Sequence, residues 1–276
     1  MKIKARMIGL DMDGTLLTTE KELTAYTRRV LEEAISRGIV VLPATGRPAC
    51  ALPAQIKLVS GIRYAVTSNG ARVIDIRENR AIFQHLIPKG IGRKILEILE
   101  QYDTLREVYY DGIGYSQEDK LKNISKYVES PFMADYIKST RTPVPDVRAK
   151  FEEERRALDK IQGIFADMQE MSAAAEKLRE IPEIEATGSI RNNIEVNAKG
   201  VNKGDALIEL GEMLGISRSE IMAFGDGRND LEMLKRVGIG VAMANGTKEV
   251  REAAGYVTES NDEEGVARFI EAYVLN

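Results

Sequence analysis

The sequence predicts an α/β fold in which a parallel-sheet core is interrupted by an inserted α+β domain. Strand and helix patterns alternate through residues 1–83 and again through residues 197–276. The stretch between them mixes helical patterns with hairpin-like strands. Because alternating strands and helices favour a parallel sheet with helical crossovers, we expect residues 1–83 and 197–276 to form one core. We call the insertion, residues 84–196, the cap domain.

Two patterns define the elements expected in the first part of the core. Continuous apolar runs are typical of strands that are covered on both faces of a parallel sheet. Apolar residues spaced three and four apart, as at Val30, Leu31, Ala34 and Ile35, are typical of amphipathic helices. These patterns predict, in order, a strand at Arg6–Leu10, a helix at Thr24–Arg37, a strand at Ile39–Leu42, a helix after Pro48, and a third strand of the sheet at Tyr64–Thr67.

The cap domain is expected to contain its own sheet. Asp111-Gly112 is suited to a tight hairpin turn between strands at Glu107–Tyr110 and Gly114–Ser116. The charge-rich segment Arg148–Asp159 is expected to be the solvated face of a helix and not a binding patch. The remaining elements expected here are helices at Ile91–Gln101, Lys120–Lys126 and Gln169–Arg179, and strands at Ile161–Phe165, Ile184–Thr187 and Asn193–Val196.

Strand and helix patterns alternate again in the last part of the sequence. Asn202 is suited to the N-cap of a helix, and Asp205 would lie in the first turn near the positive end of the helix dipole. The elements expected are helices at Lys203–Leu214, Asp230–Val237, Thr247–Ala254 and Asp262–Tyr273, and strands at Ile221–Phe224, Ile239–Ala242 and Tyr256–Thr258.

The composition argues against several classes of protein. The 276 residues include 39 Lys and Arg against 43 Asp and Glu, a mildly acidic balance that argues against a nucleic-acid partner. No apolar run approaches the roughly 18–20 residues that a membrane helix needs, and a signal-peptide pattern is missing. We therefore expect a cytoplasmic protein with no membrane partner. The sequence does not indicate its oligomeric state.

The sequence contains one cysteine, Cys50, and one histidine, His85. An internal disulfide and metal sites built from cysteine or histidine clusters are therefore excluded. Cys50 stands among small and apolar residues and is expected to pack as a hydrophobe. The chemistry must accordingly depend on carboxylates, hydroxyl groups and lysine.

Asp11 and Asp13 directly follow the apolar run Met7–Leu10, at the end of a strand where open α/β sheets place their ligands. An extended backbone projects residues i and i+2 to the same side, so a cation could lie between the two carboxylates, or one carboxylate could act beside the other. Gly14 allows the chain to turn with a positive φ. A turn and a helix cap would explain this motif equally well if it stood alone.

Three further motifs stand at strand or helix ends. Thr45-Gly46-Arg47 offers a hydroxyl and backbone amides that suit a phosphate oxygen. Lys203 begins a helix, where the dipole disfavours a cation unless an anion is near. The last motif is Gly225–Asp230, which follows the strand expected at Ile221–Phe224. Helix capping accounts for its Asn229 and Asp230, but it leaves Asp226 unexplained.

The order and residue types of these motifs resemble the haloacid dehalogenase superfamily of phosphatases. They are most similar to its Cof-type branch, which carries a large type IIB cap. The resemblance spans the whole sequence, without a departure at a catalytic position. The matching motifs are Asp11-x-Asp13-Gly14-Thr15, Thr45-Gly46-Arg47, Ser68-Asn69-Gly70-Ala71, Gly200-Val201-Asn202-Lys203-Gly204 and Gly225-Asp226-Gly227-x-Asn229-Asp230.

The resemblance implies a Rossmann-like core and phosphoryl transfer through an aspartyl-phosphate. Asp11 would be the nucleophile, Asp13 the acid and then the base, and Thr45 and Lys203 would stabilise the transferred group. Hard oxygen ligands favour Mg²⁺ as the cofactor. The metal site implied by the resemblance consists of Asp11, Asp13 through its backbone carbonyl, Asp226 and Asp230. The phosphate and substrate contacts expected on the core are Met12, Gly46, Arg47, Asn69 and Asn229.

These observations predict a Mg²⁺-dependent phosphatase that acts on small phosphorylated metabolites, in particular sugar phosphates. A phosphomutase of the same superfamily shares the covalent step and remains an alternative. A non-catalytic metabolite-binding protein on the same fold is a second alternative; it would be expected to lack the nucleophile or the acid, and both Asp11 and Asp13 are present. A phospho-receiver module is disfavoured by the large insertion and by the second aspartate. The sequence does not indicate the substrate or the cap residues that select it.

Overall fold

The computed structural model describes residues 2–276, and the chain divides into two compact units. The core unit contains the residues up to Arg47, Leu52–Phe83 and Asn202–Asn276, and the cap unit contains Pro48–Ala51 and Gln84–Val201. A parallel sheet lies in the first unit and a largely antiparallel sheet in the second, which confirms the predicted α/β fold class. Among the described residues, no helix has the length and apolar character needed to span a bilayer.

The core sheet is parallel and has the strand order β14-β13-β12-β1-β2. The central strand β1 aligns Met7 with Ile221 of β12 on one side and with Val40 of β2 on the other. The strands and helices of this layer are β1 (Met7–Leu10), α1 (Ala25–Ser36), β2 (Val40–Pro43), α2 (Ala54–Lys57), α8 (Lys203–Met213), β12 (Ile221–Gly225), α9 (Leu231–Arg236), β13 (Ile239–Met243), α10 (Lys248–Ala253), β14 (Tyr256–Thr258) and α11 (Gly265–Ile270).

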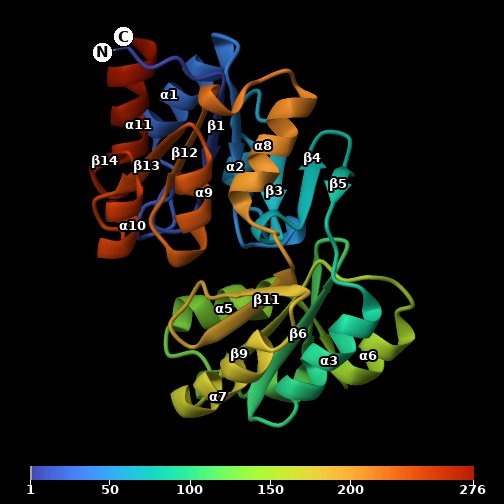
Figure 1. Cartoon of the computed structure of the whole chain (residues 1–276). Helices are drawn as coiled ribbons and strands as arrows, with labels where there is room; N and C mark the ends of the chain where they lie inside the picture. The colour runs from blue at the N-terminus through green and yellow to red at the C-terminus, as the bar shows by residue number, and fades with distance from the viewer. Residues whose placement is uncertain (1) are drawn as a thin grey trace. The chain divides into compact units, whose positions relative to one another are not determined.

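Helices cover both faces of this sheet, as the core unit in Figure 1 shows. Ile8 and Leu10 of β1 belong to the apolar cluster that includes α1 and α11, whereas Met7 belongs to the cluster that includes α8 and α9. Gly9 lies under α8, and a Cβ there would stand 2.4 Å from Leu207. This two-sided burial explains why the strands consist of continuous apolar runs.

The third predicted strand belongs to a different sheet. β3 (Tyr64–Thr67) pairs antiparallel with β4 (Arg72–Asp75), and β5 (Arg80–Gln84) completes the sheet order β3-β4-β5. A parallel bridge between Ala44 and Val66 links β3 to the end of β2. β3 thus lies parallel to the end of β2, as expected, but its main pairing is the antiparallel one with β4. The alternation of strand and helix patterns did not reveal β4 and β5, because their charged and partly exposed residues lack an apolar run.

The cap unit contains a sheet of order β10-β11-β9-β6-β7-β8, antiparallel except for the pair β7 and β8. Helices α3, α6 and α7 pack on one face, and α4 and α5 contribute to the apolar cluster on the other. The bounds are α3 (Lys89–Leu99), β6 (Thr104–Tyr110), β7 (Ile113–Gln117), α4 (Glu118–Lys122), α5 (Pro131–Thr140), β8 (Arg141–Val144), α6 (Val147–Glu153), β9 (Lys160–Phe165), α7 (Met168–Arg179), β10 (Ile184–Thr187) and β11 (Asn193–Ala198).

The predicted hairpin turn is present between β6 and β7. Asp111 and Gly112 both have positive φ, 51° and 74°, as a two-residue turn of this hand requires. The sequence patterns did not predict α5 or β8. The charge-rich segment after Val147 is helical only as far as Glu153, and Val147 and Phe151 bury the inner face of that helix.

The sequence analysis assigned two segments to the core that belong to the cap unit in the structure. Residues 197–201 do so because β11 continues to Ala198, which pairs with Ile184. Pro48–Ala51 does so because the Cys50 amide donates a hydrogen bond to the Gly112 carbonyl at 3.2 Å. Cys50 is exposed, so the expectation that it packs as a hydrophobe is wrong; in this 3₁₀ turn Ala51 is the buried residue.

Candidate active site

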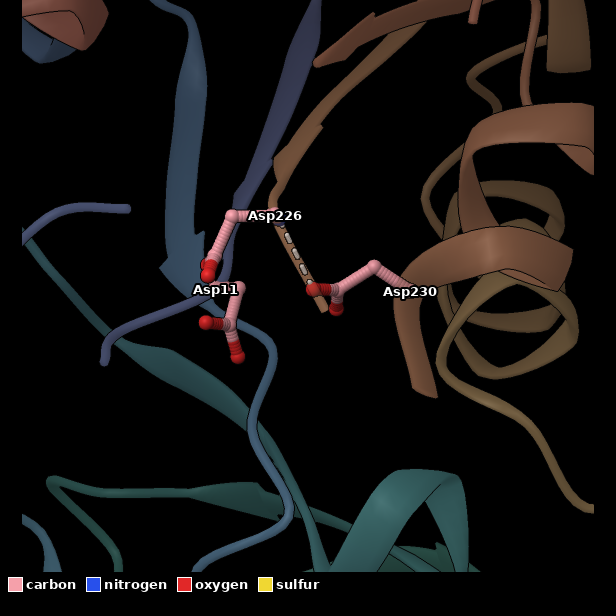
Figure 2. Close-up of side chains that lie close together, drawn as sticks. All are labelled: Asp11, Asp226 and Asp230. Carbon is pink, nitrogen blue, oxygen red and sulfur yellow. Dashed lines mark hydrogen bonds between the residues drawn. The ribbon is translucent and has the colours of Figure 1, made fainter. Parts of the chain in front are cut away.

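Three carboxylates meet where strands β1 and β12 end. Asp11 follows β1, and its amide donates to the Phe224 carbonyl at 3.0 Å, so the ends of the two strands stay side by side. Asp226 follows β12, and Asp230 precedes α9. Figure 2 shows these side chains converging, with a hydrogen bond from the Asp226 amide to the Asp230 carboxylate. A ligand atom from each of Asp11, Asp226 and Asp230 lies within 4.8 Å of the others.

The surroundings of these carboxylates disfavour their ionised forms. Asp11 is 6% exposed and Asp230 is fully buried. Burial, followed by the charge of Asp230, raises the pKa of Asp11 well above its usual range, while Lys203 opposes the rise. Burial and the charge of Asp230 also raise the pKa of Asp226 to about 6. Buried carboxylates that repel one another in this way are suited to bind a divalent cation through their oxygen atoms.

Lys203 is the cation that the protein itself supplies to this cluster. Its side chain is fully buried at the first position of α8, and its Nζ lies 2.6 Å from Asp11 Oδ1 and 2.7 Å from Asp230 Oδ1. Burial alone would lower the pKa of Lys203, but the charges of Asp11 and Asp230 raise it above its usual value. These two carboxylates explain how a lysine is tolerated at the start of a helix.

Asp230 also organises the loop that carries Asp226. Its Oδ2 accepts hydrogen bonds from the amides of Asp226 and Gly227 at 3.0 and 2.9 Å, while its Oδ1 accepts from Lys203. Gly225 permits this close approach, because a Cβ there would stand 2.5 Å from the Asp230 Cβ. Asp230 thus positions Asp226 by accepting a hydrogen bond from its backbone amide, and it positions Lys203 through an ion pair.

Asp13 points to a different set of partners. The Arg47 guanidinium forms a bidentate ion pair with the Asp13 carboxylate, with Nε 2.8 Å from Oδ2 and Nη2 2.7 Å from Oδ1. Lys21 Nζ lies 3.0 Å from the same Oδ1. Burial acts to raise the pKa of Asp13, but Arg47 and then Lys21 lower it below its usual value. The structure therefore separates the two aspartates of the first motif into different electrostatic environments.

The loops that carry the remaining predicted contacts are hydrogen-bonded to one another. The Thr45 hydroxyl accepts from the Arg47 amide at 3.1 Å across Gly46, and the Asn69 amide donates to the Thr45 carbonyl at 3.0 Å. Asn229 Nδ2 donates to Asn69 Oδ1 at 3.3 Å. The Met12 side chain is buried in the core, so only its backbone is placed to contact a ligand.

The structure also brings in residues to which the sequence analysis assigned no role. The Thr15 hydroxyl donates to Asp226 Oδ1 at 2.7 Å and links the two strand ends. Asn245 Nδ2 donates to the Gly14 carbonyl at 2.8 Å. Thr15 belongs to the first motif, but the sequence does not show which group its hydroxyl contacts. For Asn245 and Lys21, the sequence pattern contains no comparable signal.

Comparison with known proteins places this geometry in a family. The family model for haloacid dehalogenase-like hydrolases matches residues 8–270. The chain is 32% identical over 276 residues to the Bacillus subtilis 5-amino-6-(5-phospho-D-ribitylamino)uracil phosphatase YcsE, covering 99% of this chain and 97% of that protein.

Two solved structures share the fold over nearly the whole chain. A haloacid dehalogenase-like hydrolase from B. subtilis superposes with a TM-score of 0.85 at 27% identity, covering 97% of this chain and 99% of the other. The subclass IIB sugar phosphatase BT4131 superposes with a TM-score of 0.82 at 25% identity, covering 97% and 98%. The chain therefore belongs to the haloacid dehalogenase-like hydrolase family and is a phosphatase.

Proposed function

We infer that this protein is a Mg²⁺-dependent phosphatase that hydrolyses small phosphorylated metabolites through an aspartyl-phosphate on Asp11. The observation that carries the proposal is the joint placement of Asp11, Asp226, Asp230 and Lys203 at the ends of two parallel strands. A carboxylate that attacks phosphorus needs nearby positive charge, because a phosphate monoester is itself anionic. The arrangement supplies one lysine and a set of ligands for a cation.

The residues present fit a magnesium ion. Asp11, Asp226 and Asp230 offer hard oxygen ligands, and this group contains neither histidine nor cysteine. The raised pKa values of Asp11 and Asp226 reflect burial and, after it, repulsion from Asp230, both of which a divalent cation would offset. We assign Asp11, Asp226 and the backbone carbonyl of Asp13 as ligands, and Asp230 as the residue that orients them. When bound, Mg²⁺ supplies positive charge against which a carboxylate and a phosphate can approach each other.

In the first step, an Asp11 oxygen attacks phosphorus. A bond forms between this oxygen and phosphorus, and the bond from phosphorus to the leaving oxygen breaks with its electron pair. Asp13 donates a proton to that oxygen, so the product leaves as an alcohol. Lys203 offsets the charge that accumulates around Asp11, while the Thr45 hydroxyl and the amide of Met12 bind the phosphoryl oxygens.

In the second step, water hydrolyses the aspartyl-phosphate. Asp13, now ionised, removes a proton from the water while the water oxygen forms a bond to phosphorus. The bond between phosphorus and the Asp11 oxygen breaks, which regenerates the carboxylate and releases phosphate. Gly46, Arg47, Asn69 and Asn229 are the remaining candidates for contacts with the substrate on the core.

We propose phosphorylated sugars and sugar alcohols as the substrate class. The relative YcsE is named for a substrate that carries its phosphate on a ribityl chain, and BT4131 is named as a sugar phosphatase. Both names describe a phosphate ester of a polyhydroxylated chain. The alkoxide of a primary alcohol is a poor leaving group, which suits an enzyme that supplies a proton from Asp13.

A screen of phosphate release tests this proposal. The full-length protein is incubated with sugar phosphates, sugar-alcohol phosphates, nucleotides and 5-amino-6-(5-phospho-D-ribitylamino)uracil, each with Mg²⁺ and with excess chelator. We expect phosphate release from polyhydroxylated monoesters that stops on chelation and returns with Mg²⁺. Undiminished turnover in chelator would exclude the metal-dependent mechanism, and transfer of phosphate to a second sugar position without release would indicate a phosphomutase.

A further inference from the structure

Lys21 adopts a backbone conformation that is unusual for its side chain. It lies in the loop between β1 and α1, and its φ of 62° is in the left-handed region. Residues other than glycine, asparagine and aspartate seldom adopt this conformation, and such strain persists where the surrounding structure holds it and often serves a function. A glycine would fit this turn at less cost. The conformation therefore raises the question of what the lysine side chain does.

Hydrogen bonds from two directions hold the loop in this shape. Within the loop, the Lys21 amide donates to the Thr18 carbonyl at 2.9 Å, and the Thr18 amide donates to the Glu22 backbone carbonyl at 3.0 Å. From α2, the Gln55 side chain donates to the Lys21 carbonyl at 2.7 Å and accepts from the Leu23 amide at 3.0 Å. Gln55 thus fixes the backbone on both sides of Glu22 and determines where the Lys21 side chain begins.

The Lys21 side chain extends to the candidate acid–base residue. Its Nζ lies 3.0 Å from Asp13 Oδ1, the oxygen that also accepts from Arg47 Nη2 at 2.7 Å. The Lys21 side chain is only 25% exposed. Two cations from separate segments of the core therefore converge on one carboxylate oxygen. An exposed pair would contribute little, but this contact adds to a bidentate grip that already restricts the carboxylate.

We propose that Lys21 is a positioning residue that holds the Asp13 carboxyl in place during the reaction. The inference depends on the proposed function, in which Asp13 exchanges a proton with the leaving oxygen and then with water. Arg47 is also a candidate for substrate contact, and its guanidinium cannot keep both bonds to Asp13 while it turns to a ligand. Lys21 retains Asp13 when Arg47 turns, because its position depends on Gln55 and not on the ligand.

The test compares Lys21→Met and Lys21→Arg with the wild-type protein on two substrates. Ribitol 5-phosphate has a leaving group that needs a proton, whereas p-nitrophenyl phosphate has one that leaves without it. Rapid quenching measures alcohol release in the first turnover, so that hydrolysis of the phosphoenzyme does not mask the effect. For Lys21→Met we expect release from ribitol 5-phosphate to slow about tenfold, part of the contribution of a general acid, because a displaced Asp13 carboxyl no longer reaches the leaving oxygen. Loss of the Lys21 charge by itself raises the pKa of Asp13 and favours its protonated form, so a slower release reports on position and not on charge. Release from p-nitrophenyl phosphate is expected to change by less than about twofold, with KM unchanged for both.

Three further variants make the result specific. Lys21→Arg keeps a cation within reach and is expected to recover most of the rate. Gln55→Leu removes the support of the loop and is expected to show the same selective loss in a weaker form. Lys57→Met removes an exposed lysine of α2 and serves as the matched control.

Distinct outcomes would overturn the inference. An equal loss on both substrates, or a wild-type rate in Lys21→Met on ribitol 5-phosphate, would refute a positioning role. A wild-type protein that releases no phosphate from any monoester would refute the proposed function and the inference together.

Discussion

Replacing Asp226 with asparagine is expected to stabilise the metal-free protein at neutral and alkaline pH and to weaken its stabilisation by Mg²⁺. Asparagine keeps an oxygen that can accept the hydrogen bond of the Thr15 hydroxyl, which lies 2.7 Å from Asp226 Oδ1. The substitution removes the negative charge that burial and Asp230 disfavour in the folded protein. The variant therefore isolates the cost of assembling a metal site before the metal is bound.

The expected magnitude follows from the pKa of Asp226. A rise from the usual 3.8 to about 6 means that the ionised folded form is disfavoured by about 3 kcal/mol relative to the unfolded chain. Because the folded state binds the proton more tightly, the stability of the wild type decreases as the pH rises through this window and levels off above it. The stability difference between variant and wild type should thus be about 3 kcal/mol at pH 8 and fall below about 1 kcal/mol near pH 4.

Thermal unfolding followed by circular dichroism measures this difference. In chelator at pH 8, we expect the Tm of Asp226→Asn to exceed that of the wild type by roughly 6–12 °C, and the gap to close toward pH 4. Saturating Mg²⁺ at pH 8 should raise the Tm of the wild type more than that of the variant. Asp135→Asn, which removes an exposed carboxylate from α5, is the matched control. A pH-independent gap, or none at all, would refute the electrostatic reasoning.

Four further substitutions test the site. Asp11→Asn is expected to lower kcat by about 10⁴-fold or more in a phosphate-release assay, and retention of a tenth of the activity would contradict its role as nucleophile. Asp13→Asn should be severely impaired but should accumulate acid-stable phosphoenzyme, detected with radiolabelled substrate, because the second step lacks its base. Lys203→Met leaves two buried carboxylates without their ammonium and should cost about 3–5 kcal/mol in urea unfolding without metal; unchanged stability would count against the ion pairs. Gly225→Ala should displace the Asp230 side chain and weaken Mg²⁺ binding about 10–100-fold by calorimetry.

The sequence predicted the elements that have a continuous apolar run or a regular helical spacing. The strands that end at Leu10 and Gly225 could be placed because both faces of the sheet are covered, so their side chains are nearly all apolar. The motif residues after these strands could then be assigned to one edge of the sheet. Strands β4 and β5 could not be placed in this way, because Arg72 and Asp75 of β4 are charged although buried, and β5 is partly exposed along its length.

The sequence alone determined which carboxylates and which lysine follow the strand and helix ends, because residue type and position along the chain are local properties. Only the tertiary structure decided how they pair. Lys203 reaches Asp11 across 192 positions of sequence because α8 packs over β1. Asp13, two residues after Asp11, turns instead to Arg47 and Lys21. Such pairing depends on how distant segments pack against one another, and a local pattern of residues contains no record of that packing.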